Sequence, residues 1–221
     1  MSPKSRTQNF YDRIADVHNL MMSVNGYRAS VAKYLRSRDD LNLDENSLVL
    51  DAGSGTGIVT LGFYAAGFEP KKTVAVDLSF NSLKVAREQF ELDAETDARN
   101  ICAVQGNVLK LPFAAETFDL IVSCGVLEYV SVDEGLREFS RVLKKGANLV
   151  LIPVRPSFIG SVLEVLYKFK THSIEETERI AEQYFEIGDV YNFPYTETIG
   201  WSKMVFLFRK KEGKWQVEVR I

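Results

Sequence analysis

The stretch Leu48-Val-Leu-Asp-Ala-Gly-Ser-Gly-Thr-Gly57 decides the fold of this 221-residue chain. It begins with apolar residues typical of a buried strand, and glycines follow at three alternate positions. Residues 58–66 then continue with the periodicity of a helix. Glycine is needed where a chain turns tightly and a ligand approaches the backbone, and a helix start offers unpaired N–H groups. The stretch therefore predicts a strand, a ligand-binding turn and a helix.

The spacing of these glycines separates two classes of ligand. A dinucleotide-binding turn reads GxGxxG, whereas Gly53, Gly55 and Gly57 form GxGxG, and Ile58 stands where the third glycine would be. Asp51 precedes the turn. A carboxylate there would repel a pyrophosphate but could accept hydrogen bonds from an ammonium group. The pattern favours an amino-acid-like ligand and disfavours a nicotinamide-dependent oxidoreductase.

Short β-branched runs alternate with amphipathic segments on both sides of the glycine turn. The predicted strands of this alternating part are 48–50, 73–76, 101–104, 120–122 and 147–153. The predicted helices between and after them are 58–66, 80–92, 132–143 and 158–169. Strands separated by helices form a parallel sheet that is covered on both faces.

The two ends of the chain depart from this alternation. Residues 184–193 and 203–209 read as strands with no long helix between them, and a turn then leads into 215–221, so antiparallel pairing is expected. Residues 9–38 read as two helices broken near Gly26. We predict an α/β Rossmann-like three-layer αβα sandwich with a mostly parallel seven-stranded sheet, an antiparallel C-terminal edge and an N-terminal helical cap. The cap, residues 1–40, is predicted to belong to the same domain as residues 41–221.

Composition and charge exclude several classes of protein. The chain is 46% hydrophobic and 26% charged, as globular proteins are, and its net charge of −3 does not indicate nucleic-acid binding. Cys102 and Cys124 form no CxxC pair and are predicted to be buried, reduced thiols, and no metal site is expected. No apolar run could span a membrane and residues 1–9 lack a signal peptide's apolar stretch, so we expect a cytoplasmic protein. The oligomeric state is not indicated.

A second acid follows twenty residues after Gly57. Asp77 directly follows the predicted strand 73–76, where a carboxylate can accept hydrogen bonds from both hydroxyls of an adenosine ribose. The alternative role is a helix N-cap, which Ser79 could fill as well. In combination with the glycine turn, Asp77 is assigned to the ribose.

These motifs resemble those of the class I S-adenosylmethionine-dependent methyltransferases, in particular the small-molecule group that includes the ubiquinone/menaquinone biosynthesis methyltransferases. Residues 49–57 match the family's first motif, and Asp77 matches its ribose-binding acid. Residues 106–113 resemble the third motif and 118–129 the fourth. Residues 136–151 resemble the helix and glycine turn before the fifth strand.

The resemblance implies S-adenosylmethionine as the cofactor, S-adenosylhomocysteine as the product and in-line methyl transfer to a small-molecule acceptor. Asn107 stands where the family usually has an acid, but its side-chain oxygen can also accept a hydrogen bond from the adenine amino group. Tyr129 stands where the family commonly has histidine, so that histidine's role cannot be assigned here.

The resemblance also implies a set of cofactor contacts at the ends of the predicted strands. The residues for the methionine part are Asp51, Gly53, Ser54, Gly55 and Cys124. Those for the ribose and the adenine are Asp77, Leu78, Asn107 and Val108. Tyr11 of the N-terminal helix is a candidate for covering the cofactor, the alternative being ordinary helix packing.

Candidate catalytic residues are few, because the methyl group arrives activated and the protein mainly positions two reactants. A general base is needed only where the acceptor must lose a proton. His18 and Glu128 are the two candidates. His18 could instead be a histidine without a catalytic role, and Glu128 a structural carboxylate.

The acceptor is only broadly indicated. Residues 123–126 differ from the Asn/Asp-Pro-Pro-aromatic motif of enzymes that methylate exocyclic amino groups of bases. Aromatic residues of the last third favour an apolar or aromatic small molecule, although cores contain such residues too. They are Phe158, Tyr167, Tyr184, Phe193, Tyr195 and Trp201. The alternative function is a catalytically silent S-adenosylmethionine-binding subunit or regulator.

Overall fold

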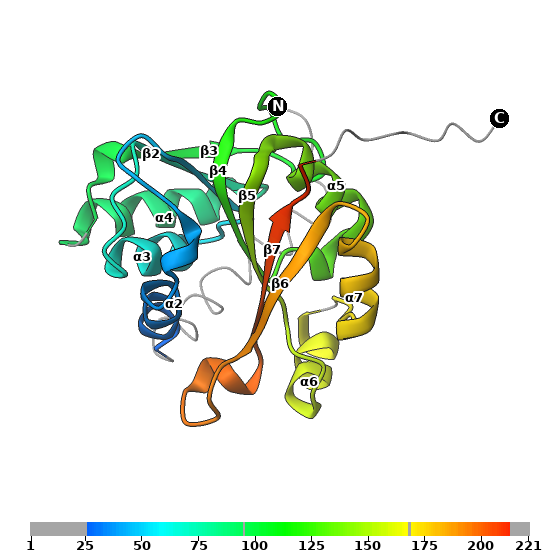
Figure 1. Ribbon diagram of the computed structural model, residues 1–221. Coiled ribbons are helices and arrows are strands. Elements are labelled where there is room, and N and C mark those ends of the chain that lie inside the picture. The colour runs from blue at the N-terminus through cyan, green and yellow to red at the C-terminus, as the bar shows by residue number, and fades with distance from the viewer. Residues whose placement is uncertain (1–25, 95, 168, 213–221) are drawn as a thin grey trace, which may run out of the picture.

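A seven-stranded sheet forms the centre of the computed structural model, which describes residues 26–94, 96–167 and 169–212 (Figure 1). The strand order is β3-β2-β1-β4-β5-β7-β6. The bounds are β1 Leu48–Ala52, β2 Lys72–Asp77, β3 Ile101–Gln105, β4 Phe118–Cys124, β5 Leu143–Ile152, β6 Phe185–Asn192 and β7 Met204–Lys210. All seven lie where the sequence predicts strands, while residues 215–221 lie outside the described residues.

Strand directions confirm the mostly parallel sheet with antiparallel pairing at its C-terminal end. β1 pairs in parallel with β2 and β4, as do β2 with β3 and β4 with β5. β7 is antiparallel to both β5 and β6. It lies between them, so the edge strand β6 runs in the same direction as β1 to β5. The carboxyl ends of the parallel strands and the start of β7 therefore meet at one edge of the sheet.

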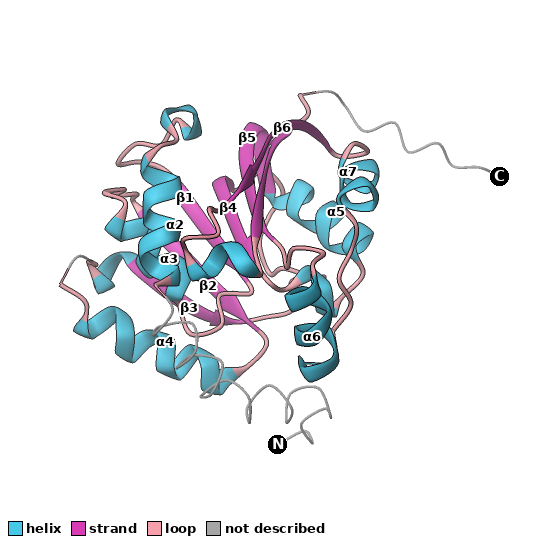
Figure 2. Cartoon of the chain, turned by 90° about the horizontal axis from the view of Figure 1, so that it is seen from below, coloured by secondary structure: helices cyan, strands magenta, loops and turns pink. Residues whose placement is uncertain are grey.

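Helices cover both faces of the sheet, which confirms the three-layer sandwich (Figures 1 and 2). α2, α3 and α4 lie on one side, and α5 and α7 on the other. The bounds are α2 Tyr27–Arg36, α3 Ile58–Ala65, α4 Phe80–Leu92, α5 Val132–Val142, α6 Phe158–Tyr167 and α7 Ile174–Ala181. A helix long and apolar enough to cross a membrane is not found in the described ranges.

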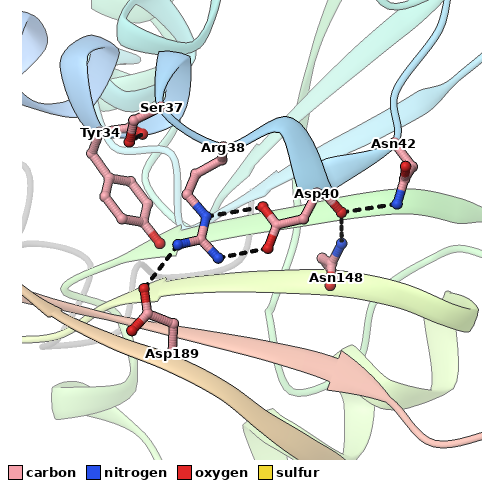
Figure 3. A network of polar contacts seen from close by, with 7 residues as sticks. All are labelled: Tyr34, Ser37, Arg38, Asp40, Asn42, Asn148 and Asp189. Atoms are coloured by element: carbon pink, nitrogen blue, oxygen red, sulfur yellow. Dashed lines mark hydrogen bonds and ion pairs between the residues drawn. The ribbon is translucent and has the colours of Figure 1, made fainter.

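α2 is fixed to the sheet at both of its ends. Gly26 precedes it with a φ of 69°, and the second predicted helix therefore begins at Tyr27, while the first predicted helix, before Gly26, lies outside the described residues. The Tyr27 hydroxyl lies 2.7 Å from the Ser202 hydroxyl near the start of β7. At the other end, Arg38 pairs with Asp40 and with Asp189 of β6 (Figure 3). The described part of the predicted cap thus packs on the sheet, while the division at residues 40 and 41 stays a prediction.

The two cysteines differ from each other in exposure. Cys124 at the end of β4 is partly buried, whereas Cys102 is exposed. The prediction that both thiols are buried is therefore wrong for Cys102. Its strand, β3, forms an edge of the sheet, where an apolar run of sequence does not guarantee burial of every side chain.

Candidate active site

The glycine turn connects β1 to α3 at the carboxyl edge of the sheet. Gly53, Gly55 and Gly57 have φ values of 77°, 52° and 86°, a conformation that disfavours residues with a Cβ. The backbone N–H groups of Gly53 and Ser54 both donate to the Val76 carbonyl, at 2.8 and 2.9 Å. The end of β2 thereby holds the turn in place.

The three glycines serve different purposes. A Cβ at Gly53 would lie 2.6 Å from the Val126 Cβ, and one at Gly57 would lie 2.4 Å from the Phe90 Cε1. These two glycines are therefore required for packing. A Cβ at Gly55 would meet no described atom within 4 Å. Gly55 is the member of the motif at which a ligand can approach the backbone.

Asp51 is a fully buried carboxylate beneath the turn. Thr60 of α3 donates to its Oδ2 at 2.6 Å, while Oδ1 has no hydrogen-bond partner among the described residues. Burial raises the pKa of Asp51 to about 7, the Thr60 hydrogen bond lowers it, and the negative charge of Asp77 raises it further. A cationic donor, such as an ammonium group, would satisfy Oδ1 and favour the ionised form.

Ser54 carries a second unsatisfied polar atom in the same turn. Its hydroxyl is buried and has no hydrogen-bond partner within the described part of the chain. Buried polar groups are normally paired, so both atoms indicate that the turn is built for a polar ligand.

Asp77 joins the end of β2 to the glycine turn. Its Oδ2 accepts from the Gly55 N–H and its Oδ1 from the Ser79 N–H, each at 2.8 Å. Ser79 caps α4 by accepting from the Ser82 N–H, so the N-cap role belongs to Ser79 rather than to Asp77. Burial raises the pKa of the Asp77 carboxyl, and the two N–H groups oppose this shift. Each oxygen keeps acceptor capacity for a ribose hydroxyl.

The predicted adenine side lies at the ends of β2 and β3. Leu78 is 40% exposed, and its carbonyl accepts from the Gln105 side chain at 3.0 Å. Asn107 is exposed, with its Oδ1 accepting from the Leu109 N–H at 2.9 Å. Val108 differs from these, because its side chain is buried in the core on the α5 side. Their roles toward adenine stay predictions.

Cys124 ends β4, and Glu128 follows in the segment whose Val126 packs against Gly53 of the glycine turn. Glu128 lies in the short 3-10 helix Leu127–Tyr129 and is buried. Its Oε1 accepts from the Val154 N–H after β5, and its Oε2 has no partner among the described residues. Burial raises the pKa of Cys124, the Lys203 charge lowers it, and the charges of Glu128 and Asp51 add to the increase.

Several residues that the sequence predicts for the site are not found in its described part. Tyr11 and His18 are outside the described residues. Among the aromatic candidates, Tyr184 and Phe193 are buried in the two main cores, so they pack the fold rather than line a pocket. Phe158, Tyr195 and Trp201 are exposed. The Tyr167 side chain is outside the described part.

Two residues of the site were missed from the sequence. Thr60 lies in the first turn of α3. A hydroxyl so soon after the glycine turn is the feature of the sequence that could have identified it as a residue of the site. Lys203 is buried just before β7, 3.9 Å from the Glu128 Oε1. No motif surrounds Lys203, and only the insertion of β7 beside β5 brings it to this edge.

Comparison with known proteins agrees with this geometry. A family described as "Methyltransferase domain" matches residues 50–151. The ubiquinone/menaquinone biosynthesis C-methyltransferase of Syntrophotalea carbinolica is 34% identical over 163 residues, covering 72% of this chain and 67% of that protein.

Two solved structures share the fold. Geranyl diphosphate C-methyltransferase from Streptomyces coelicolor A3(2), in complex with Mg²⁺, geranyl-S-thiolodiphosphate and S-adenosyl-L-homocysteine, has a TM-score of 0.65 at 18% identity, covering 81% of this chain and 74% of that one. A methyltransferase in complex with the Haloferax volcanii Trm112 methyltransferase activator has a TM-score of 0.73 at 16% identity, covering 95% and 100%. With the sequence relationship above, these likenesses lead to one conclusion: the chain belongs to the class I S-adenosylmethionine-dependent methyltransferases.

Proposed function

We propose that this chain is a cytoplasmic enzyme that transfers a methyl group from S-adenosylmethionine to an apolar or aromatic small molecule. The observation that carries the proposal is the glycine turn with its buried, unsatisfied acceptor atom. Asp51 Oδ1 has no partner among the described residues, and Asp51 directly precedes the turn whose Gly55 has no described atom within 4 Å of a Cβ position. When bound, S-adenosylmethionine supplies a methyl group already activated by its positive sulfur.

The chain's own residues bind and orient the cofactor in this proposal. Asp51 attracts the ammonium of the methionine part, Ser54 hydrogen-bonds the same part, and Gly55 leaves room for it. Asp77 accepts from the ribose hydroxyls and is held for this task by the Gly55 and Ser79 N–H groups, at 2.8 Å each. Because Asp77 also accepts from the Gly55 N–H, the ribose-binding carboxylate and the turn that binds the methionine part are held in place by the same hydrogen bond.

The outer contacts are proposed by position. Leu78 offers an exposed apolar side chain beside the adenine, and Asn107 and Val108 follow at the end of β3. Cys124 flanks the methionine part at the end of β4. Tyr11 and His18 remain candidates, as cover and as base respectively, that lie outside the described residues.

The region beyond β5 supports an apolar acceptor. α6 follows the end of β5, and the chain after α6 returns to the site, where the Lys170 N–H donates to the Glu128 carbonyl at 3.0 Å. Several apolar side chains of α6 are exposed: Phe158, Ile159, Val162, Val165 and Leu166. Such surface is unusual unless it serves a ligand or partner. The names of the Syntrophotalea and Streptomyces proteins describe carbon methylation in quinone biosynthesis and of geranyl diphosphate, which agrees with this direction.

The proposal is tested with S-adenosylmethionine labelled on its methyl group. The purified chain is incubated with a panel of quinols, phenols and isoprenoid diphosphates, and extracted label is counted. Transfer to at least one member is expected. The silent-subunit alternative predicts tight binding of S-adenosylhomocysteine but no labelled product from the chain alone. Repeating the assay with a Trm112-type activator separates an enzyme that needs a partner from a chain with no activity.

A further inference from the structure

Lys203 is a buried lysine at the carboxyl edge of the sheet. It is 7% exposed and lies opposite Val154, the residue whose N–H holds Glu128. Lysine is rarely buried without a partner, because an ammonium group loses much hydration in a protein interior. Its position therefore calls for a specific explanation.

The lysine has no close hydrogen-bond acceptor in the described chain. The nearest carboxylate oxygen is Glu128 Oε1, 3.9 Å from Nζ, and that oxygen already accepts from the Val154 N–H. The other oxygen, Oε2, is buried and unpaired within the described residues. The ammonium group of Lys203 and the carboxylate of Glu128 thus lie side by side without a hydrogen bond between them.

This pair lies next to the proposed cofactor site. Gly125, the first residue after β4, has a φ of 66°, and a Cβ there would be only 2.8 Å from the Lys203 Nζ. The ammonium group therefore lies over the backbone that follows Cys124. Val126, one residue further, packs against Gly53 of the glycine turn.

The electrostatic surroundings keep Lys203 charged. Burial lowers its pKa, whereas Cys124, Glu128, Tyr27 and Tyr129, each in its ionised form, raise it, and the net direction is upward. The side chain is accordingly an ammonium group at neutral pH.

We infer that Lys203 and Glu128 bind the methyl acceptor through an ionisable hydroxyl, as in a phenol or an enol. Lys203 holds the oxygen as an oxyanion, and Glu128 accepts the proton on Oε2. This inference rests on the proposed function and names the acceptor class of the same site. A methyl acceptor that is already an anion, such as a carboxylate, would be repelled by Glu128. A neutral hydroxyl can instead give its proton to Glu128, and the oxyanion that this leaves pairs with Lys203.

The chemistry balances without another reactant. The O–H bond breaks, its proton moves to Glu128 and its electron pair stays on the oxygen beside Lys203. That oxygen, or a ring carbon conjugated with it, then bonds to the methyl carbon as the electron pair of the methyl–sulfur bond goes to sulfur. If carbon is the nucleophile, the hydrogen it carried leaves as a proton to water.

The test uses coloured phenols as probes, because their ionised forms absorb in the visible range. 4-Nitrophenol, 2-methyl-4-nitrophenol and 4-nitro-1-naphthol are titrated into the complex with S-adenosylhomocysteine at a pH where the free probe is mostly neutral. The wild-type complex is expected to shift at least one probe to its ionised band. Lys203→Met should lose that band or weaken probe binding at least tenfold, while Lys203→Arg keeps most of it.

Lys210→Met is the matched control. Lys210 is also buried, but its Nζ donates to the Leu143 carbonyl at 2.6 Å at the opposite edge of the sheet, so its loss should leave the band unchanged. Calorimetry with S-adenosylhomocysteine shows whether each variant is folded, and Lys203→Gln replaces Lys203→Met if that variant is not.

Two failures are distinguishable. If the wild-type chain does not bind S-adenosylhomocysteine, the proposed function fails. If it does, but no probe is ionised, or the Lys203 variants ionise it equally, the inference about Lys203 and Glu128 alone is overturned.

Discussion

Replacing Asp51 by asparagine should stabilise the ligand-free protein at pH 8 while weakening cofactor binding. Burial raises the pKa of this carboxyl from 3.8 to about 7. A shift of about 3 units corresponds to roughly 4 kcal/mol of destabilisation once the group is ionised. The asparagine would keep the hydrogen bond from Thr60 but bury an amide donor, which costs about 1–3 kcal/mol when unpaired. We expect a net gain of about 1–3 kcal/mol in the free energy of unfolding at pH 8.

The pH dependence has a definite sign. Because the pKa is higher in the folded state than in the unfolded chain, the destabilisation begins above pH 3.8 and is complete above about pH 7. The wild-type free energy of unfolding should fall across this range, and the part of that fall due to Asp51 should be absent in Asp51→Asn. The advantage of the variant should therefore shrink toward pH 5.

Urea unfolding at pH 5 and pH 8 measures both effects, and calorimetry with S-adenosylhomocysteine measures the lost affinity. Removing a hydrogen bond to an ammonium group should weaken binding about 10- to 100-fold. Asp119→Asn is a control at the other edge of the sheet, where the carboxylate pairs with Lys144 at 2.8 Å and its loss should lower stability. An Asp51→Asn protein that is less stable than wild type by the same amount at both pH values refutes the reasoning.

Further outcomes separate packing from binding. Gly57→Ala should lose roughly 2–5 kcal/mol of unfolding free energy, because its φ is 86° and its Cβ would meet Phe90. Gly55→Ala should lose only about 1–2 kcal/mol but bind S-adenosylhomocysteine far more weakly; equal stability losses in urea would contradict the different purposes of the two glycines. Asp77→Asn should reduce calorimetric affinity about tenfold or more, and an unchanged affinity would remove Asp77 from the ribose site. Wild-type affinity should decline by up to about tenfold per pH unit below pH 7, because Asp51 must ionise; a flat profile from pH 8 to 5.5 would exclude that requirement.

The fold was largely predictable because its determinants are local in the sequence. The glycine turn marks the first crossover, and the alternation of short apolar runs with helical segments predicts the parallel part of the sheet. The insertion of β7 between β5 and β6 was not predictable, because two strands without a helix between them can pair at an edge in more than one order.

The site was predictable to the extent that its residues belong to the glycine turn or end a strand. Asp51, Gly55 and Asp77 are found together because β1 and β2 are adjacent and parallel. Lys203 could not be predicted, because its place beside Glu128 depends on the register of β7 against β5, which no local pattern encodes. The exposure of Cys102 has a similar origin, since only the strand order makes β3 an edge.

A crystal structure of the chain with S-adenosylhomocysteine tests the central claim most directly. It should show the adenosine ribose hydroxyls within hydrogen-bond distance of the Asp77 carboxylate and the amino group of the ligand next to the turn around Ser54. Two results would contradict the assignment of this edge of the sheet as a methyl-donor site: S-adenosylhomocysteine bound elsewhere on the protein, or no ligand bound at the glycine turn at a saturating ligand concentration.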